Sequence, residues 1–158
     1  EAYTSLKDKN ILILGSGGTA KAIGYGIKEK GGKLTITYNR NKEKGENLAK
    51  ELGCELIHCR DAGTQSIDIL INCSPVGMNP NINESPFLAR DFKEGMVVFD
   101  SVYNPLETKL LREAKAAGCK VIPGSELFIN QAARQFELFT GQPAPIDAMR
   151  EVLMEKLN

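Results

Sequence analysis

The sequence predicts an α/β fold, with a doubly wound, mostly parallel six-stranded sheet and helices on both faces. Short apolar runs alternate along the chain with stretches of helical periodicity, and this order requires parallel strands because each crossover returns the chain to the same edge. The runs at 11–14 and 69–72 are almost continuously apolar, as in strands that are covered on both faces. A cluster of glycines follows the first run, at 15–18.

Six apolar runs are expected to be strands. They are residues 11–14, 34–38, 55–57, 69–72, 96–99 and 121–122. Helical stretches separate most of them, and Gly31, Gly53 and Gly118 each follow such a stretch, where a left-handed residue commonly ends a helix. Residues 73–86 contain three prolines and three asparagines and are expected to form a long loop.

Length and charge restrict the class of protein. A chain of 158 residues suits one domain with a single core. Lys plus Arg and Asp plus Glu both total 20, so no overall field favours nucleic acid or a lipid surface, and we expect neither as a partner. The sequence has no apolar stretch of about 18 residues and no signal-peptide pattern, which favours a cytoplasmic protein.

The domain boundaries follow from the same pattern. Residues 1–9, "EAYTSLKDK", are expected to be the remnant of an interdomain linker or helix, and residues 10–158 to form one domain that includes the C-terminal helices. In the last stretch Ile146, Met149, Leu153 and Leu157 share one helical face. We expect this helix to pack into the core rather than against a partner helix.

The four cysteines show no CxxC or Cys/His metal spacing. A metal pair around Cys54, His58 and Cys59 is one interpretation of their proximity. We prefer reduced, mostly buried thiols and no metal site.

The glycine cluster matches a phosphate-binding loop. Residues 15–20, "GSGGTA", fit GxGxxG/A directly after a strand and before a helix, which is the context of the Rossmann-type dinucleotide fingerprint. The first glycine permits a tight turn, the second admits a pyrophosphate to the backbone, and the helix N-terminus attracts its charge. The alternatives are a tight turn without a ligand and a nucleoside site for a methyl donor.

The end of the second predicted strand selects the cofactor. In an NAD site an acidic residue about 20 positions on binds the ribose 2′-hydroxyl, whereas this chain has Asn39 and then Arg40, with Lys42 and Lys44 close by. A guanidinium suits bidentate phosphate recognition, so the pattern predicts NADP. The alternative is an ordinary solvated charged turn.

Four later segments complete a family resemblance. They are "INCSPVGM" at 71–78, "FDSVYNPLETKLL" at 99–111, "GSELFINQA" at 124–132 and "FELFTG" at 136–141. Together with "GSGGTAKA" and "NRNKEK", in this order and spacing, they resemble the nucleotide-binding half of the shikimate dehydrogenase family. The resemblance extends from Asn10 to about Gly141.

The resemblance implies a role for particular residues. It places the diphosphate on Gly15, Ser16, Gly17, Gly18 and Thr19, and the adenosine 2′-phosphate on Asn39, Arg40 and Lys44. It places the nicotinamide ribose and ring near Cys73, Ser74, Val76, Ser101, Gly124 and Leu127. It implies that Tyr103 and Gln131 bind the substrate. The chain departs from the family pattern at Asn41, Cys73, Ser74, Pro75 and Leu127.

Two of these polar residues also have an interpretation from the sequence pattern alone. Around Gln131 the helical pattern is apolar on two sides, which indicates two covers, the sheet of this domain and a second domain across a cleft; the alternative is a solvated polar face. Asp100 stands at a strand end, where we expect a helix cap or a loop hydrogen bond rather than a catalytic acid.

The resemblance further implies chemistry that this chain does not complete. The family reduces 3-dehydroshikimate to shikimate with NADPH, and a Lys and an Asp of an N-terminal substrate domain transfer the proton. Neither motif is present here, so we expect no catalytic residue in this chain, an absent substrate domain, and NADP binding without turnover. The "FTGQPAP" junction is similar to plant proteins fused to 3-dehydroquinate dehydratase. A non-catalytic NADP sensor and a methyl-donor-dependent transferase are the alternatives.

Overall fold

A computed structural model describes residues 4–157 of the chain. Within these residues six strands form one sheet in the order β3-β2-β1-β4-β5-β6, and every neighbouring pair is parallel. The strands are β1 Asn10–Leu14, β2 Lys33–Tyr38, β3 Glu55–His58, β4 Ile69–Asn72, β5 Val97–Asp100 and β6 Lys120–Ile122. The predicted doubly wound sheet is confirmed, and all of its strands are parallel.

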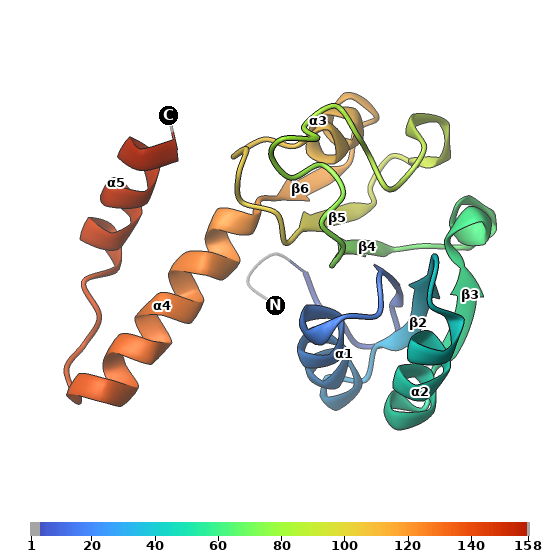
Figure 1. The fold of residues 1–158 in the computed structure, drawn as a ribbon, viewed down its shortest axis with the longest axis horizontal. Helices are drawn as coiled ribbons and strands as arrows, with labels where there is room; N and C mark the ends of the chain where they lie inside the picture. Colours follow the sequence, from blue (N-terminus) through green and yellow to red (C-terminus); the bar gives the residue numbers. More distant parts are fainter. Residues whose placement is uncertain (1–3, 158) are drawn as a thin grey trace.

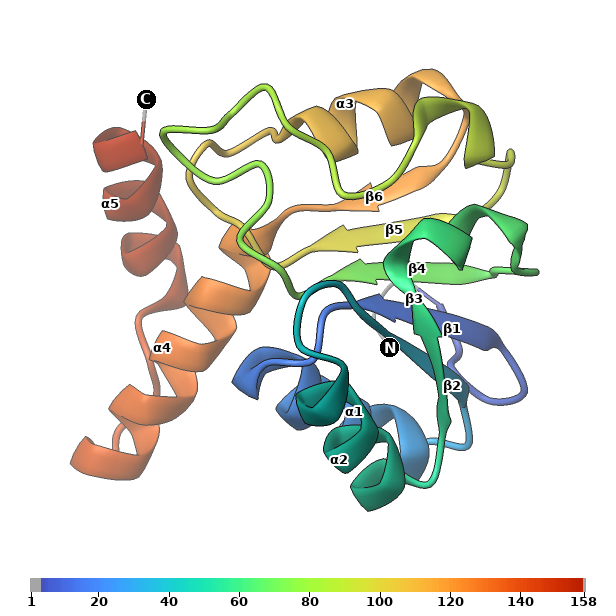
Figure 2. The same ribbon diagram turned by 45° about the vertical axis from the view of Figure 1, so that its right-hand side comes forward.

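Helices cover both faces of this sheet (Figure 1). They are α1 Gly18–Glu29, α2 Lys42–Leu52, α3 Lys109–Ala116, α4 Gly124–Thr140 and α5 Ile146–Leu157, with short 3₁₀ helices η1 Cys59–Thr64 and η2 Ala89–Asp91. Figure 2 shows α1 and α2 on one side of the sheet and α3 on the other. The expected helices on both faces are therefore confirmed.

The central strand β1 illustrates why both faces are covered. Ile11 and Ile13 belong to the core cluster under α1 and α2, whereas Leu12 and Leu14 belong to the cluster under α3. All four side chains are at most 2% exposed. Complete burial of each such side chain stabilises the fold by about 1.5–3 kcal/mol, so apolar residues at every position of this strand are what a two-faced sheet requires.

The sequence order of the strands reverses direction at β1. Strands β2 and β3 lie on one side of it and β4, β5 and β6 on the other. In open parallel sheets ligands bind outside the carboxyl ends of the strands at such a point. A ligand-binding site is therefore expected at the loops that follow β1, β4 and β5.

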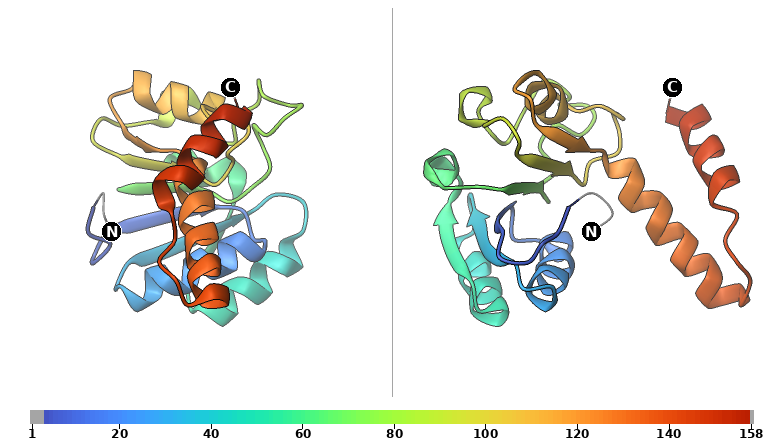
Figure 3. Two further views of the ribbon diagram at one scale, coloured as in Figure 1. Left: turned by 90° about the vertical axis from the view of Figure 1, so that its left-hand side faces the viewer. Right: turned by 180° about the vertical axis from the view of Figure 1, so that it is seen from behind.

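The last two helices project away from the sheet as an α4–α5 arm, residues 124–157 (Figures 1 and 3). Helix α4 starts among buried residues, Gly124 and Ser125, but Phe139 near its end is 88% exposed. Helix α5 has no buried residue within its described part and packs on α4. The guanidinium of Arg150 pairs with the carboxylate of Glu126 across the two helices.

The expectation that α5 packs into the core is wrong. Ile146 is 41% exposed and Val152 is 55% exposed. The physical reason is connectivity, because α4 carries the chain away from the sheet before α5 begins. The apolar face of α5 instead lines a groove of about 460 Å³ against α4.

The segment before β1 is only partly described, and Glu1 to Tyr3 lie outside the described residues. Residues 4–9 form no helix: Leu6 packs against the core, and the amide of Asp8 donates to the carbonyl of Gly31 over 3.0 Å. This part of the predicted linker is therefore tied to the domain.

Candidate cofactor-binding site

The turn after β1 requires a glycine at its first position. Gly15 has φ +120°, and a Cβ atom there would lie 3.2 Å from the carbonyl oxygen of Cys73. Its amide donates to the hydroxyl of Thr37 over 3.0 Å, and Thr37 is buried. The turn is thus held between β2 and the loop after β4, and a side chain at Gly15 would be strained.

The next two glycines face open space. A Cβ atom on Gly17 or Gly18 would meet no atom within 4 Å, so internal packing does not require glycine at either position. Gly17 is the N-cap of α1 and no side chain caps this helix, whereas Asn41 caps α2 and Thr108 caps α3. The amide groups at the start of α1 remain available to an anion, and the helix dipole favours its charge.

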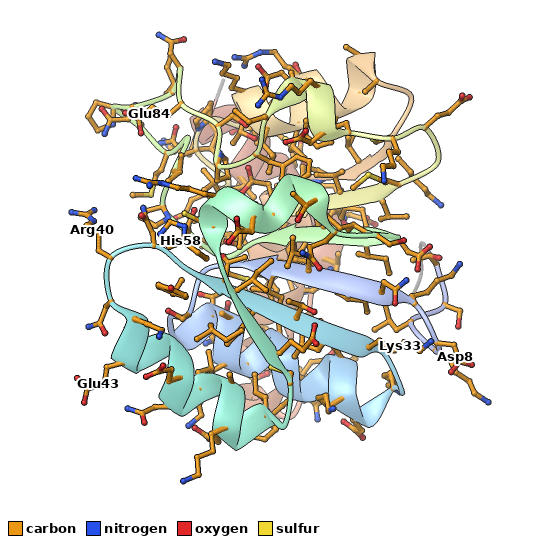
Figure 4. All side chains as sticks on the ribbon, turned by 90° about the vertical axis from the view of Figure 1, so that its right-hand side faces the viewer. Asp8, Lys33, Arg40, Glu43, His58 and Glu84 are labelled. Atoms are coloured by element: carbon orange, nitrogen blue, oxygen red, sulfur yellow. The ribbon has the colours of Figure 1, made fainter. Side chains whose placement is uncertain are left out.

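Cationic side chains flank the start of α2. Figure 4 shows Arg40 reaching away from the body of the molecule on the loop between β2 and α2. Asn39, Arg40 and Lys44 are exposed, and no carboxylate of residues 4–157 pairs with Arg40. Lys42 is paired with Glu46 at 3.3 Å. Arg40 is therefore free to bind an anion.

Asn41 explains one departure from the family pattern. Its side-chain oxygen accepts from the amide of Lys44 over 2.8 Å and so caps α2. Asparagine caps helices about as well as serine and better than threonine. Asn41 thus stabilises the start of the helix that carries Lys44.

The loops after β1, β4 and β5 enclose a pocket of about 420 Å³. Five of the sequence-predicted residues line it, namely Thr19, Cys73, Ser74, Ser101 and Tyr103. The other lining residues are Pro75, Met78, Asn79, Val102 and Asn104. The topology therefore brings together the segments that the sequence analysis assigned to the nicotinamide end and to the substrate.

Tyr103 connects this pocket to the α4–α5 arm. Its side chain is 40% exposed, and its ring lies 4.7 Å from the ring of Phe128 on α4, tilted by 32°. Aromatic pairs at such distances stabilise each other by about 0.5–1.5 kcal/mol. Phe128 was not predicted as a site residue, because its helical phase alone does not show which loop it meets.

The start of α4 approaches the same edge. A Cβ atom on Gly124 would collide with the carbonyl oxygen of Val102 and would lie 2.8 Å from that of Asp100. The helix has Pro123 as its N-cap and no side-chain cap. Gly124 is therefore required for close packing whatever it binds.

Three other predicted residues lie elsewhere around the site. Leu127 is half-buried and Gln131 is exposed on α4, and neither lines the 420 Å³ pocket. Val76 lines a separate cavity of about 360 Å³ beside residues 83–89. Val76 is held in its loop by its backbone, because its carbonyl oxygen accepts from the side-chain amide of Asn72 over 3.4 Å.

Asn72 and Asp100 form a buried pair below the pocket. Both are 0% exposed, and the Asn72 amide donates to Asp100 Oδ1 over 2.9 Å. Asp100 also accepts from the Val102 amide over 3.0 Å and from the Thr108 hydroxyl over 2.7 Å. The expected loop hydrogen bond of Asp100 is confirmed. Asn72 was not identified as a site residue, although a polar residue ending an apolar strand was a usable signal.

Burial controls the ionisation of two of these groups. It raises the pKa of Asp100 above its ordinary value, although the hydrogen bonds from Thr108, Val102 and Asn72 act in the opposite direction. Burial also raises the pKa of the Cys73 thiol to about 12, and the Asp100 carboxylate adds to that shift. Cys73 is thus a neutral thiol in the pocket wall, not a nucleophile.

A larger cavity, of about 740 Å³, lies away from these loops. Its lining includes Asn10, Lys33 and Glu55, the first residues of β1, β2 and β3. It therefore opens at the amino edge of the sheet. Because ligands of parallel sheets bind at the carboxyl edge, the smaller pocket is the candidate site.

His58 has a structural role in the described chain. Its Nδ1 accepts from the amide of Arg60 over 3.1 Å and so caps η1, and its ring contacts that of Tyr38 edge-on.

Residues 4–157 contain no group of three or more His, Cys, Asp or Glu side chains that could hold a metal ion. None of the helices in this part of the chain is long and apolar enough to cross a membrane.

Two family models match this chain. The model described as "NADP oxidoreductase coenzyme F420-dependent" matches residues 10–104, and the one described as "Shikimate 5'-dehydrogenase C-terminal domain" matches residues 124–154. The first range contains the glycine turn and Arg40, and the second contains most of the α4–α5 arm.

Individual proteins match over almost the whole chain. The shikimate dehydrogenase (NADP(+)) of Methanococcoides burtonii is 42% identical over 97% of this chain and 57% of its own length. The chloroplastic bifunctional 3-dehydroquinate dehydratase/shikimate dehydrogenase of Arabidopsis thaliana is 39% identical over 94% of this chain and 25% of its own. A crystal structure of a shikimate dehydrogenase with NADP+ superposes with TM-score 0.86 at 34% identity, over 96% of this chain and 56% of that one. The chain spans less than two-thirds of the length of these relatives.

Proposed function

The chain belongs to the shikimate dehydrogenase family of NADP oxidoreductases, and from that premise we propose that it is the NADP-binding domain of an enzyme that reduces 3-dehydroshikimate to shikimate. The observation that carries the proposal is the uncapped start of α1, with open space at Gly17, on the same edge of the sheet as Arg40. A diphosphate suits the first feature, and a 2′-phosphate suits the second.

The described residues fit this cofactor by their chemistry. In the proposal the amides of residues 17–19 bind the diphosphate, and Arg40 with Lys44 binds the 2′-phosphate. Cys73, Ser74 and Ser101 form the wall on the nicotinamide side. When bound, NADPH supplies a hydride to the carbonyl carbon of the substrate.

Reduction of a carbonyl also needs a proton at its oxygen. Within residues 4–157 no Lys, His, Asp or Glu lines the 420 Å³ pocket, and the Cys73 thiol, with its pKa near 12, is a poor donor at neutral pH. We therefore assign proton transfer to a Lys and an Asp of a substrate domain, with Tyr103 and Gln131 as substrate contacts from this side. A cytoplasmic location remains part of the proposal.

Binding of dinucleotides to the 158-residue chain tests the cofactor assignment. NADP should bind at least tenfold more tightly than NAD, since a charge-assisted hydrogen bond contributes about 1.5–3 kcal/mol. A sulfonium methyl donor should not compete with NADP, which separates the oxidoreductase from the methyl-transfer alternative. Equal affinity for NAD and NADP would contradict the proposal.

Steady-state kinetics test the assignment of the proton donor. The 158-residue chain with NADPH and 3-dehydroshikimate should turn over far more slowly than the ordinary enzyme range of about 1 s⁻¹ and above. Ordinary turnover by this chain would refute the assignment. Addition of a substrate domain that restores turnover would separate the dehydrogenase from a non-catalytic NADP sensor.

A further inference from the structure

We propose that Asn72 and Asp100 are positioning residues for the 420 Å³ pocket, which hold the loops after β4 and β5 in the arrangement that receives the nicotinamide end of a dinucleotide. The inference rests on the proposed binding of NADP at this edge. Neither side chain lines the pocket, so both would act through the loop residues that do.

The pair occupies equivalent positions at the ends of neighbouring strands. Asn72 and Asp100 are register partners of β4 and β5, and both are fully buried. Their side chains join over 2.9 Å, and the amide of Ser101 donates to the carbonyl oxygen of Asn72 over 2.9 Å. The two loops thus begin from one hydrogen-bonded unit.

Asn72 fixes the loop after β4. Its Oδ1 accepts from the Ser74 amide over 2.9 Å and from the Ser74 hydroxyl over 2.7 Å. Its amide nitrogen donates to Asp100, and also to the Val76 carbonyl over 3.4 Å. One buried side chain therefore holds both sides of Pro75, and it determines where Cys73 and Ser74 stand in the pocket wall.

Asp100 fixes the loop after β5 in the same way. Its Oδ1 accepts from the amide of Val102, which stands between Ser101 and Tyr103 in the sequence. Its Oδ2 accepts from the hydroxyl of Thr108, which caps α3. The carboxylate thus has three donors, and the loop that carries Ser101 and Tyr103 is anchored on one side to Asn72 and on the other to α3.

The hydrogen bond between Asn72 and Asp100 does not by itself account for a polar pair at this place. Two buried polar partners are often replaced by apolar groups of similar shape with little loss of stability. An apolar pair, however, would leave the amides of Ser74 and Val102 without these acceptors, and the loops would lose the bonds that set their shape. The distinctive contribution of the pair is therefore loop geometry.

The test compares two ligands by calorimetric titration of the 158-residue chain. NADP reaches both ends of the proposed site, whereas adenosine 2′,5′-bisphosphate carries only the adenosine end. With Asn72→Ala, the Kd of NADP should rise about tenfold, as expected for loss of one loop anchor, while the Kd of the bisphosphate should change less than about twofold.

Leu110→Ala is the control for general destabilisation. It opens the core under α3 but leaves the hydrogen-bond partners of Asn72 and Asp100 unchanged. It should lower the melting temperature without changing the ratio of the two Kd values. Asn72→Asp, which keeps an acceptor for Ser74 but loses the amide donated to Asp100 and Val76, is the milder variant if Asn72→Ala does not fold, and it should weaken NADP selectively by a smaller factor.

The outcomes are distinguishable. Selective weakening of NADP supports the positioning role. Equal weakening of both ligands, or no change in a folded variant, overturns it. If the unmodified chain binds neither ligand, the proposed function fails first, and the inference fails with it.

Discussion

Arg40 carries the selection between two nearly identical cofactors in the proposed site. It is exposed on the loop before α2, and no carboxylate of residues 4–157 competes for it. NAD sites have an acidic residue that binds the free ribose hydroxyl, whereas this chain has Asn39, directly after β2, at the corresponding place. A phosphate rather than a hydroxyl is the group that this arrangement can bind strongly.

We therefore expect Arg40→Ala to weaken NADP by about tenfold to a hundredfold, the range of one charge-assisted contact. The Kd of NAD should stay within about twofold, because NAD lacks the phosphate. Isothermal titration measures both constants. Arg90→Ala removes a guanidinium that is 81% exposed on η2 and serves as the control. An equal loss for both cofactors would contradict the role of Arg40.

Asp100 gives a second residue-level prediction, for the pH dependence of stability. Its pKa in the folded chain is raised above the ordinary 3.8, chiefly by burial. The folded chain therefore holds this proton more tightly than the unfolded chain. The contribution of Asp100 to stability is fully present below pH 3.8 and is lost as pH rises through the raised pKa.

The Asp100→Asn variant should not lose stability in this way as the pH rises. Its amide keeps an acceptor for Asn72 and Val102 and can donate to Thr108, whose hydroxyl accepts equally well. The difference in unfolding free energy, variant minus wild type, should become more positive as the pH rises from 4 to 7 in urea titrations. Asp147→Asn, on the surface of α5, controls for simple loss of charge. A difference that does not vary with pH would show that burial of the carboxylate is not decisive.

The strand-to-helix turn after β1 contains one glycine that the fold requires and one that it does not. Gly15 has φ +120° and abuts the Cys73 carbonyl, whereas Gly17 has φ −89° and open space around its missing Cβ. The two positions lie in one turn, yet only the first is demanded by the fold.

Gly15→Ala and Gly17→Ala should therefore behave differently. Gly15→Ala should destabilise the chain by about 1–3 kcal/mol, because the residue must hold a strained backbone. Gly17→Ala should lower the melting temperature less, only by the cost of a poorer N-cap, but should weaken NADP, because a methyl group would occupy the approach of the diphosphate. Thermal melting and titration of both variants check this. A Gly17→Ala variant that binds NADP normally would argue against diphosphate contact at this amide.

The α4–α5 arm determines the shape of the whole molecule. It projects from the sheet as Figure 3 shows, and its distal residues Leu138 and Phe139 are 68% and 88% exposed. No described residue of α5 is buried. The helix pair is held by its own contacts, the Glu126–Arg150 pair among them, and contributes little to the core of the sheet.

Removal of residues 142–158 should consequently leave the sheet folded. We expect the truncated chain to retain cooperative unfolding and NADP affinity within about threefold, because no described residue of α5 is buried and none lines the 420 Å³ pocket. Circular dichroism in urea and titration measure both properties. Leu110→Ala, which opens the core under α3, should by contrast cost about 2–5 kcal/mol. Loss of cooperative folding on truncation would show that α5 is part of the core.

The sheet was predictable because its determinants are local. Apolar runs, glycine helix ends and the glycine turn predicted all six strands to within one residue at each boundary. The anion-binding turn expected at Asn39, directly after β2, stays a prediction. The expected position of α5 was wrong for a related reason. Its amphipathic pattern indicates that one face is covered, but not what covers it.

The parallel doubly wound sheet, the turn after β1 and the likeness to shikimate dehydrogenases could be predicted from the sequence, because short-range periodicity and ordered motifs carry that information. The three-dimensional structure was needed to show that Asn72 and Asp100 meet below the pocket, that Tyr103 contacts Phe128, and that α5 packs on α4 outside the core. These contacts join residues from different elements, and no spacing along the chain encodes which side chains meet when strands and helices assemble.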